Sequence, residues 1–311
     1  MMALIDDRAT ILLLADCPNH KKRLSSFYFQ GCAVLKSLSV RAFSRVLLGA
    51  AAALLIVPAS AAQVVKIGAA HFPPYTIRPE KGADTGLLPD LIEALNAVQH
   101  DYQFIIVPTS IPRRFRDFEQ GRIDIAIFEN PEWDWKDIPH QTVDMKLEDA
   151  EVFVARKAPG RGQGYFDDLR DKRLALFSGY HYAFAGFNAD PKFLSSNFNT
   201  TLTYSHDSNL LMVLRERADV ALVTRSYLSD FMARNETEAS QLMVSEKVDQ
   251  TYRHYALLRP QAPLDAAQFQ ALLQQLRDNG QMLQIFQRFR IAVLPLVSNQ
   301  AVAEQPVQAG R

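Results

Sequence analysis

The chain has 311 residues and a formal net charge of zero, from 34 basic and 34 acidic side chains. This balance offers no electrostatic footprint for nucleic acid or for an anionic membrane surface. Cys17 and Cys32 are its only cysteines, so the long segment after them has no thiol from which to build a disulfide framework.

The N-terminal region has the order of parts of a cleavable signal peptide. Residues 47–57 form an apolar run of 11, fewer than the roughly 20 that a transmembrane helix needs. Small residues follow Pro58, at the spacing that a signal peptidase needs. Three basic side chains precede the run: Lys36, Arg41 and Arg45. We therefore predict export to the periplasm, with cleavage near Ala61 and Ala62.

We expect residues 1–62 to be a leader, and a translation start nearer Leu35 would explain its unusual length. The mature chain, residues 63–311, then holds 27 basic and 31 acidic side chains, a net charge near −4. No cysteine follows the cleavage site, which argues against a lipid-modified mature terminus. The mature chain's 249 residues are enough for one large domain or two modest domains with real cores.

The first half of the mature chain alternates predicted strands and helices. The strands are short apolar runs, and the last of them is the nearly continuous kind found in parallel sheets covered on both faces. The helices show apolar residues on one face. This alternation favours an α/β architecture. The predicted strands are residues 64–69, 104–107 and 123–128, and the predicted helices are residues 89–98 and 113–120.

One unit, a helix end followed by a short turn and a buried strand, occurs twice. Asp124 and Asp219 each stand at the start of such a strand, 95 positions apart. The repeat and the length together predict two similar α/β lobes.

Two segments are predicted to be hinge crossings between the lobes, residues 151–156 and 252–258. A stretch rich in proline and glycine follows the first of them, as expected at a boundary. The last segment is polar and featureless, and we expect a disordered tail there. The predicted division is lobe 1 at residues 63–154 and 252–296, lobe 2 at residues 155–251, and the tail at residues 297–311.

Five pieces of the mature chain follow one another in a familiar order: IGAAHFPPY (67–75), GLLPDLIEAL (86–95), GRIDIAI (121–127), LRDKRLALFSG (169–179) and LLQQLRDNGQMLQIFQRF (272–289). Together they resemble the family 3 periplasmic solute-binding proteins, the partners of polar amino-acid ABC transporters. The resemblance covers roughly residues 64–291. It implies a type II, Venus-flytrap fold, in which two lobes joined by two crossing strands close on a ligand in the cleft.

The chain departs from the family pattern at two ligand contacts. The family has an arginine beyond the GRIDIAI strand that clamps a carboxylate, and here the nearest match is Lys136, a point charge without the bidentate fork. The family has an aspartate that holds an α-ammonium group, and here Thr224 stands there. A subgroup carries its arginine at the start of the second helix, where Arg113 and Arg114 lie. We therefore expect Arg113 or Arg114 to hold an anion and ordinary α-amino acids to bind poorly.

Aromatic and acidic residues follow the predicted strands of lobe 1, where ligands of open α/β sheets lie. Phe72 and Tyr75 can stack on a planar or cationic ligand, or pack the loop against the first helix. Glu129 can accept from an ammonium or hydroxyl group, or remain a solvated carboxylate. Trp133 can form a stacking wall, or pin its loop to the lobe together with Trp135.

Lobe 2 offers a backbone site. Ser178, Gly179 and Tyr180 follow a predicted strand and open a predicted helix, whose free N–H groups bind carboxylates. His181 comes next and is more simply read as a surface group. Thr224 ends another strand and either bonds across the cleft or caps the following helix.

We predict a periplasmic solute-binding protein that captures a small polar, carboxylate-bearing solute, amino-acid-like or an organic acid, and delivers it to an ABC permease of the inner membrane. It is expected to be a monomer and not an enzyme. No glycine-rich phosphate loop or close histidine–carboxylate spacing appears, so no cofactor or metal is expected. The ten predicted ligand-binding residues are Phe72, Tyr75, Arg113, Glu129, Trp133, Lys136, Ser178, Gly179, Tyr180 and Thr224.

Two other readings use the same cleft. In the first, the protein is a periplasmic ligand-sensing module for a membrane receptor or signalling enzyme. In the second, it is a periplasmic dehydratase in which Glu129 acts as a general acid, with aromatic neighbours raising its pKa.

Overall fold

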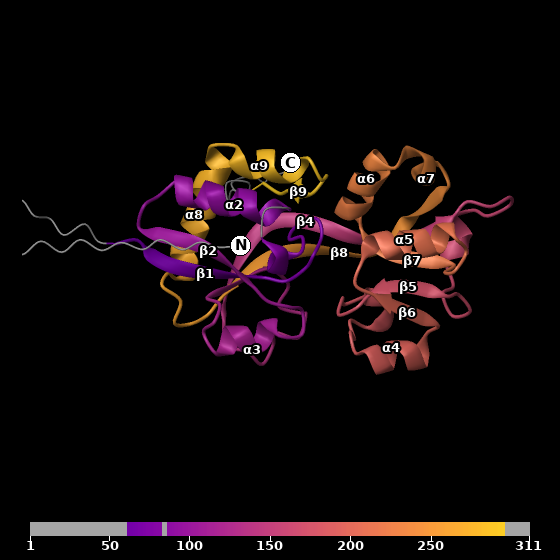
Figure 1. The fold of residues 1–311 in the computed structure, drawn as a ribbon, viewed down its shortest axis with the longest axis horizontal. Helices are drawn as coiled ribbons and strands as arrows, with labels where there is room; N and C mark the ends of the chain where they lie inside the picture. Colours follow the sequence, from indigo (N-terminus) through magenta and orange to yellow (C-terminus); the bar gives the residue numbers. More distant parts are fainter. Residues whose placement is uncertain (1–60, 83–85, 296–311) are drawn as a thin grey trace, which may run out of the picture. The chain divides into compact units, whose positions relative to one another are not determined.

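The computed structural model describes residues 61–82 and 86–295, which fall within one compact unit that begins at Ser60 (Figure 1). The predicted signal sequence as far as Ser60 and the tail predicted at residues 297–311 lie outside these ranges. Within them, no helix has the length and apolar character needed to cross a membrane.

The first lobe opens with parallel strands and covering helices. Strand β1 pairs in parallel with both β2 and β3. Helix α2 begins directly after Gly86 and buries an apolar face that includes Leu87, Leu91 and Leu95. The elements are β1 (Gln63–Ala69), η1 (Pro79–Lys81), α2 (Leu87–Ala97), β2 (Tyr102–Pro108), α3 (Arg114–Glu119) and β3 (Ile125–Glu129).

Two long strands cross between the lobes, β4 (Gln141–Arg156) and β8 (Leu242–Leu258). They run antiparallel side by side from Gln141↔Leu258 to Arg156↔Leu242, with register shifts on both sides of Val152 (Figure 1). Such bulges bend a strand, which lets one pair of strands serve two lobes. The crossings thus exist as predicted, and their strands begin well before residues 151 and 252.

The second lobe repeats the parallel arrangement, with β5 between β6 and β7. The sheet order in the described residues is β2-β1-β3-β8-β4-β7-β5-β6, with β9 on β4. The elements of the second lobe are η2 (Gln163–Phe166), β5 (Leu174–Phe177), η3 (Ala183–Ala185), α4 (Pro191–Asn197), β6 (Thr200–Thr203), α5 (His206–Leu214), β7 (Val220–Thr224), α6 (Arg225–Arg234) and α7 (Glu236–Ser240). After β8 the chain returns to the first lobe with α8 (Ala266–Asp278), α9 (Gln281–Gln287) and β9 (Ala292–Val293).

The two lobes have separate cores. One core unites β1, β2 and β3 with α2, α8 and α9, so the C-terminal helices pack on the first lobe (Figure 1). Two further clusters lie on the strands and helices between Val152 and Leu242. Each lobe therefore buries its own apolar faces, and the crossing strands connect them.

The repeated aspartates have equivalent structural roles. Asp124 accepts from the backbone N–H of Lys66 at 3.0 Å, and Asp219 accepts from that of Arg173 at 2.8 Å. Each carboxylate also pairs with an arginine, Arg259 and Arg173 respectively, at 2.9 and 2.8 Å. The repeat in the sequence therefore marks how each lobe ties the start of a strand to its neighbour, not a ligand contact.

Candidate functional site

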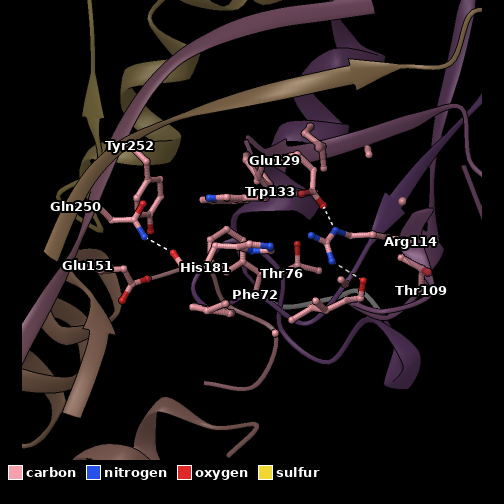
Figure 2. A pocket seen from close by; sticks show the side chains of 18 residues that line it. Phe72, Thr76, Thr109, Arg114, Glu129, Trp133, Glu151, His181, Gln250 and Tyr252 are labelled. Atoms are coloured by element: carbon pink, nitrogen blue, oxygen red, sulfur yellow. Dashed lines mark hydrogen bonds and ion pairs between the residues drawn. The ribbon is translucent and has the colours of Figure 1, made fainter. Parts of the chain in front are cut away.

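A cavity of about 60 Å³ lies between the lobes, with room for about four to six water molecules (Figure 2). The first lobe contributes loops after β1, β2 and β3, and the second contributes the loop after β5. The crossing strands close one end. The lining residues are Gly68, Ala70, Phe72, Thr76, Thr109, Ile111, Arg114, Ala126, Ile127, Phe128, Glu129, Trp133, Glu151, Gly179, Tyr180, His181, Gln250 and Tyr252.

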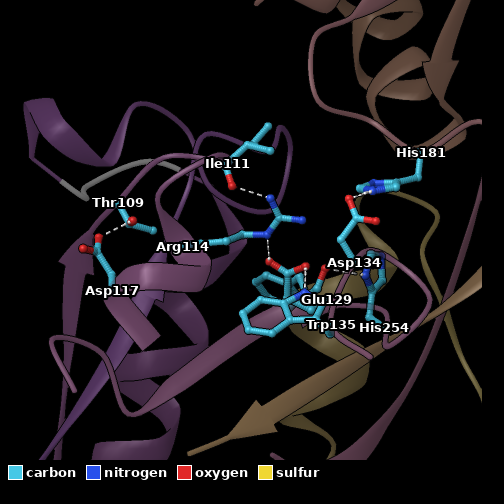
Figure 3. A network of polar contacts seen from close by, with 10 residues as sticks. Thr109, Ile111, Arg114, Asp117, Glu129, Asp134, Trp135, His181 and His254 are labelled. Atoms are coloured by element: carbon cyan, nitrogen blue, oxygen red, sulfur yellow. Dashed lines mark hydrogen bonds and ion pairs between the residues drawn. The ribbon is translucent and has the colours of Figure 1, made fainter. Parts of the chain in front are cut away.

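Arg114 is the first residue of α3 and is only 5% exposed. Its Nε lies 2.7 Å from Glu129 Oε1, an ion pair by distance whose angle is not that of a hydrogen bond. Trp135 Nε1 donates to the other oxygen of Glu129 at 2.9 Å, and Arg114 Nη1 donates to the Ile111 carbonyl (Figure 3). Among the described residues, Nη2 has no hydrogen-bonding partner. Glu129 and Ile111 thus fix the guanidinium while leaving donors for a further acceptor.

Thr109 lies beside Arg114 and is held by a second network. Its hydroxyl donates to Asp117 Oδ2 at 2.6 Å, and Arg122 pairs with the same oxygen at 2.9 Å (Figure 3). The Thr109 hydrogen bond, and then the charge of Arg122, lower the pKa of Asp117. Asp117 is therefore an anion that holds the Thr109 side chain in place.

Glu151 stands on β4 at the opposite end of the cavity, directly across from Gln250 on β8 (Figure 2). It is 2% exposed, and its Oε2 has no hydrogen-bonding partner among the described residues. Burial, followed by the nearby charges of Asp149 and Asp249, raises the pKa of Glu151 well above its usual value. The crossing strands thus carry a buried carboxyl group that no basic side chain neutralises.

Aromatic rings form the wall between these two ends. Phe72 meets Trp133 and Tyr180 edge to face, with ring centroids 6.4 and 5.3 Å apart. Trp133 meets Tyr252 in the same way at 5.3 Å. Edge-to-face contacts of this kind are favourable and hold each ring in place. The aromatic wall therefore has its shape before a ligand binds.

The two lobes touch over the cavity. His181 Nε2 lies 3.0 Å from Asp134 Oδ2, and the His181 ring stacks on Trp133 with centroids 6.1 Å apart. Gly179 has φ +85°, and a Cβ there would lie 2.8 Å from Ile111 Cγ2, so only glycine permits this approach. Burial lowers the pKa of His181 although Asp134 opposes the shift. These contacts show the lobes in a closed arrangement.

Five of the ten predicted ligand-binding residues line the cavity: Phe72, Glu129, Trp133, Gly179 and Tyr180. Tyr75 and Thr224 do not, because both are fully buried in the hinge region. Tyr75 Oη donates to Asp149 at 2.9 Å, and Thr224 Oγ1 accepts from the Tyr227 N–H at 3.3 Å as the N-cap of α6. The structure thus gives Thr224 the capping role, which was the alternative to a ligand contact.

Arg113, Lys136 and Ser178 line an outer groove instead of the cavity. Arg113 is the N-cap residue of α3 and is exposed, whereas Arg114, about 100° further around the helix, turns inward. Lys136 is exposed and lies 3.9 Å from Glu132. Of the two arginines considered from the sequence, Arg114 is therefore the one at the cavity.

Several lining residues were not predicted. Gln250 and Tyr252 come from β8, Glu151 comes from β4, and Thr109 directly follows β2. Glu151 did leave a signal, since it is a charged residue inside an otherwise apolar stretch, Ala150 to Ala155. Isolated charges in buried strands point to functional positions.

The family of the chain follows from its sequence. Residues 90–301 match the family model described as "ABC transporter, phosphonate, periplasmic substrate-binding protein", and the chain belongs to this family. No curated protein matches the chain.

Solved structures share the fold. A binding component of an ABC transporter from Wolinella succinogenes, complexed with lysine, has 16% identity and a TM-score of 0.57, covering 72% of this chain and 94% of its own. The GluR0 ligand-binding core with L-glutamate has 17% identity and a TM-score of 0.58, covering 73% and 98%. A histidine kinase sensor domain has 18% identity and a TM-score of 0.57, covering 73% and 96%.

These comparisons confirm the predicted class. The fold is that of the two-lobed, type II periplasmic binding proteins. Family membership makes the chain a periplasmic substrate-binding protein of an ABC transporter, a binding protein and not an enzyme.

We expect Glu151→Gln to stabilise the protein at pH 7 and to have little effect at pH 4. The pKa of this carboxyl is higher in the folded protein than its ordinary value of 4.5 in the unfolded chain. As the pH rises above 4.5, the unfolded chain loses its proton first, so the free energy of unfolding decreases. The uncharged amide of glutamine avoids this decrease. The free energy of unfolding at pH 7 should therefore increase by about 1–3 kcal/mol, which should raise Tm by several degrees. Thermal melts at both pH values measure it. The control is Glu148→Gln on the same strand, and an equal effect at pH 4 and 7 would contradict the prediction.

Proposed function

We propose that the exported chain, cleaved near Ala61 and Ala62, captures a small carboxylate-bearing solute in the cavity between the lobes and delivers it to an ABC permease. The observation that carries this proposal is Arg114, a buried guanidinium and, among the described residues, the only lysine or arginine that lines the cavity between the lobes. Arginine presents planar donors that match a carboxylate, and a desolvated site strengthens the attraction. This proposal keeps the anion site expected at the start of the second helix, with Arg114 in place of Arg113.

The second lobe can add a backbone donor to the same carboxylate. The N–H groups of Ser178 and Tyr180 are used internally, donated to the carbonyls of Thr203 and Phe177 at 2.7 and 3.3 Å. The Gly179 N–H has no such partner among the described residues, and Gly179 lines the cavity. A donor on each lobe gives the solute contacts that form fully only when the lobes are closed.

Closure would be a hinge motion on β4 and β8. The contacts of His181 with Asp134 and Trp133 join the lobes, so they would form on closing and break on opening. A permease that separates the lobes would release the solute. The protein would work as a monomer, since both walls of the cavity come from one chain.

A thermal-shift screen tests the proposal. The protein is purified from the periplasm of an expressing cell and melted with amino acids, polyamines and organic acids. A ligand at 100 times its Kd stabilises the folded state by about 2.7 kcal/mol, and we expect carboxylates to produce such shifts. N-terminal sequencing of the same material should find Gln63 or a close neighbour first. A library in which no carboxylate raises Tm would overturn the proposal.

A further inference from the structure

The end of the cavity at Glu151 holds three buried oxygen atoms without partners. They are Glu151 Oε2, Tyr180 Oη and Tyr252 Oη, and none has a hydrogen-bonding partner among the described residues. All three residues line the cavity. Buried polar groups are nearly always hydrogen-bonded, to protein or to water, so these three oxygens mark a part of the cavity that can hold a polar group.

The charge of the cavity specifies the kind of partner. Among the described residues of the lining, Arg114 is the only lysine or arginine, and Glu129 pairs with it. Glu151 is the remaining acid, and burial lowers the pKa of His181, the only other titratable nitrogen there. Burial disfavours the charged form of Glu151. A bound cation would offset this cost by pairing with the carboxylate, whereas a bound anion would disfavour the charged form further.

The three oxygen acceptors at this end also indicate which kind of cation would bind there. A primary ammonium has three N–H donors and no acceptor, which matches one carboxylate and two phenol oxygens. The rings of Phe72, Trp133 and Tyr252 also line the cavity, and an aromatic face presented to a cation attracts it.

The position of this end relative to Arg114 specifies the rest of the solute. Figure 2 shows Glu151 and Gln250 at one end of the cavity and Arg114 with Thr109 at the other, with the aromatic rings between them. In an α-amino acid the ammonium and the carboxylate are on one carbon, whereas here the two polar ends lie on either side of aromatic rings, so we expect a longer spacing between the two groups.

We infer that the solute is an ω-amino carboxylate, with a primary ammonium held by Glu151, Tyr180 and Tyr252 and a carboxylate held by Arg114. The inference rests on the proposed function, because it assigns the second half of the same ligand. The chain between the two groups is short and apolar and lies along the aromatic wall. A cavity of about 60 Å³ limits that chain to a few methylene groups.

The test compares each amine with the carboxylate in which a methyl group replaces the ammonium. The pairs are 3-aminopropanoate with butanoate, 4-aminobutanoate with pentanoate, and 5-aminopentanoate with hexanoate. Affinities are measured by calorimetry on the periplasmic protein. At least one amine should bind ten-fold or more tightly than its counterpart, and tighter than 2-aminobutanoate by a similar factor. If no amine outbinds its counterpart, or if 2-aminobutanoate binds as tightly, the inference is wrong.

Variants of Glu151 test whether this residue causes the tighter binding of the amine than of the plain carboxylate. Glu151→Gln should remove most of the preference for the amine and leave the affinity for the plain carboxylate within about three-fold. Glu148→Gln, on the same strand and outside the cavity, should keep the preference. A preference that survives Glu151→Gln would place the ammonium elsewhere and overturn the assignment.

The outcomes separate this inference from the proposed function. If plain carboxylates and amines bind equally well and both need Arg114, the inference fails and the proposed function stands. If no carboxylate of any kind binds, both fail.

Discussion

Replacing Arg114 by alanine should weaken binding of the carboxylate solute by about 30- to 4,000-fold, or about 2–5 kcal/mol. The guanidinium is buried and fixed by Glu129 and Ile111, so the solute's carboxylate would lose its only cationic partner in the cavity lining. Arg114→Lys should recover part of the loss, because the charge remains while the planar fork is lost. Calorimetry with the best carboxylate from the thermal-shift screen measures the affinity of the unmodified protein, of Arg114→Ala and of Arg114→Lys.

Arg113→Ala is the matched control for this experiment. Arg113 is the adjacent residue, carries the same charge and faces the outer groove. Its removal should change the affinity by less than about three-fold, as expected for an exposed charge screened by solvent. A larger effect for Arg113→Ala than for Arg114→Ala would place the anion site in the groove and not in the cavity. Thermal melts of each variant show whether a lost affinity reflects lost folding.

The second large effect is expected at Asp149, which joins the two lobes within the hinge. This residue on β4 accepts from Tyr75 Oη at 2.9 Å, from Ser226 Oγ at 2.5 Å and from the Ala150 N–H at 2.8 Å. Tyr75 belongs to the first lobe, and Ser226 lies in the first turn of α6 in the second. Burial raises the pKa of Asp149 although these donors oppose the shift. The carboxyl is thus the common acceptor of a buried network.

Asp149→Ala should destabilise the protein by about 3–5 kcal/mol, because each buried donor left without an acceptor costs about 1–3 kcal/mol. For a domain of this size Tm should fall by about 6–20 °C. Asp149→Asn keeps one acceptor oxygen and should lose less. Glu148→Ala, at the neighbouring position on β4, should lose less than about 1 kcal/mol. A melt of Asp149→Ala that matches the unmodified protein would show that the network does not stabilise the hinge.

Much of the fold could be predicted because its signals are local. The alternation of apolar runs and amphipathic helices gave the α/β class, and Asp124 and Asp219 marked equivalent strand starts in the two lobes. Residues at the ends of parallel strands were also accessible to prediction, since such ends converge on one edge of a sheet. Phe72 and Glu129 are of this kind, and both line the cavity.

The rest of the candidate site depends on geometry that a pattern does not contain. The choice between Arg113 and Arg114 depends on the residue at which α3 begins, since one step turns a side chain by about 100°. Glu151, Gln250 and Tyr252 lie within the crossing strands, where register shifts decide which side chains face the cavity. Tyr75 lies outside the cavity lining because its hydroxyl donates to Asp149, an acceptor 74 residues later in the chain.

A crystal structure of the periplasmic protein grown with its best-binding carboxylate would show directly whether Arg114 holds the solute. We expect the solute in the cavity between the lobes, with a carboxylate oxygen within hydrogen-bonding distance of the Arg114 guanidinium and the lobes closed over it. A solute bound in the outer groove beside Arg113 and Lys136, with no contact to Arg114, would contradict it.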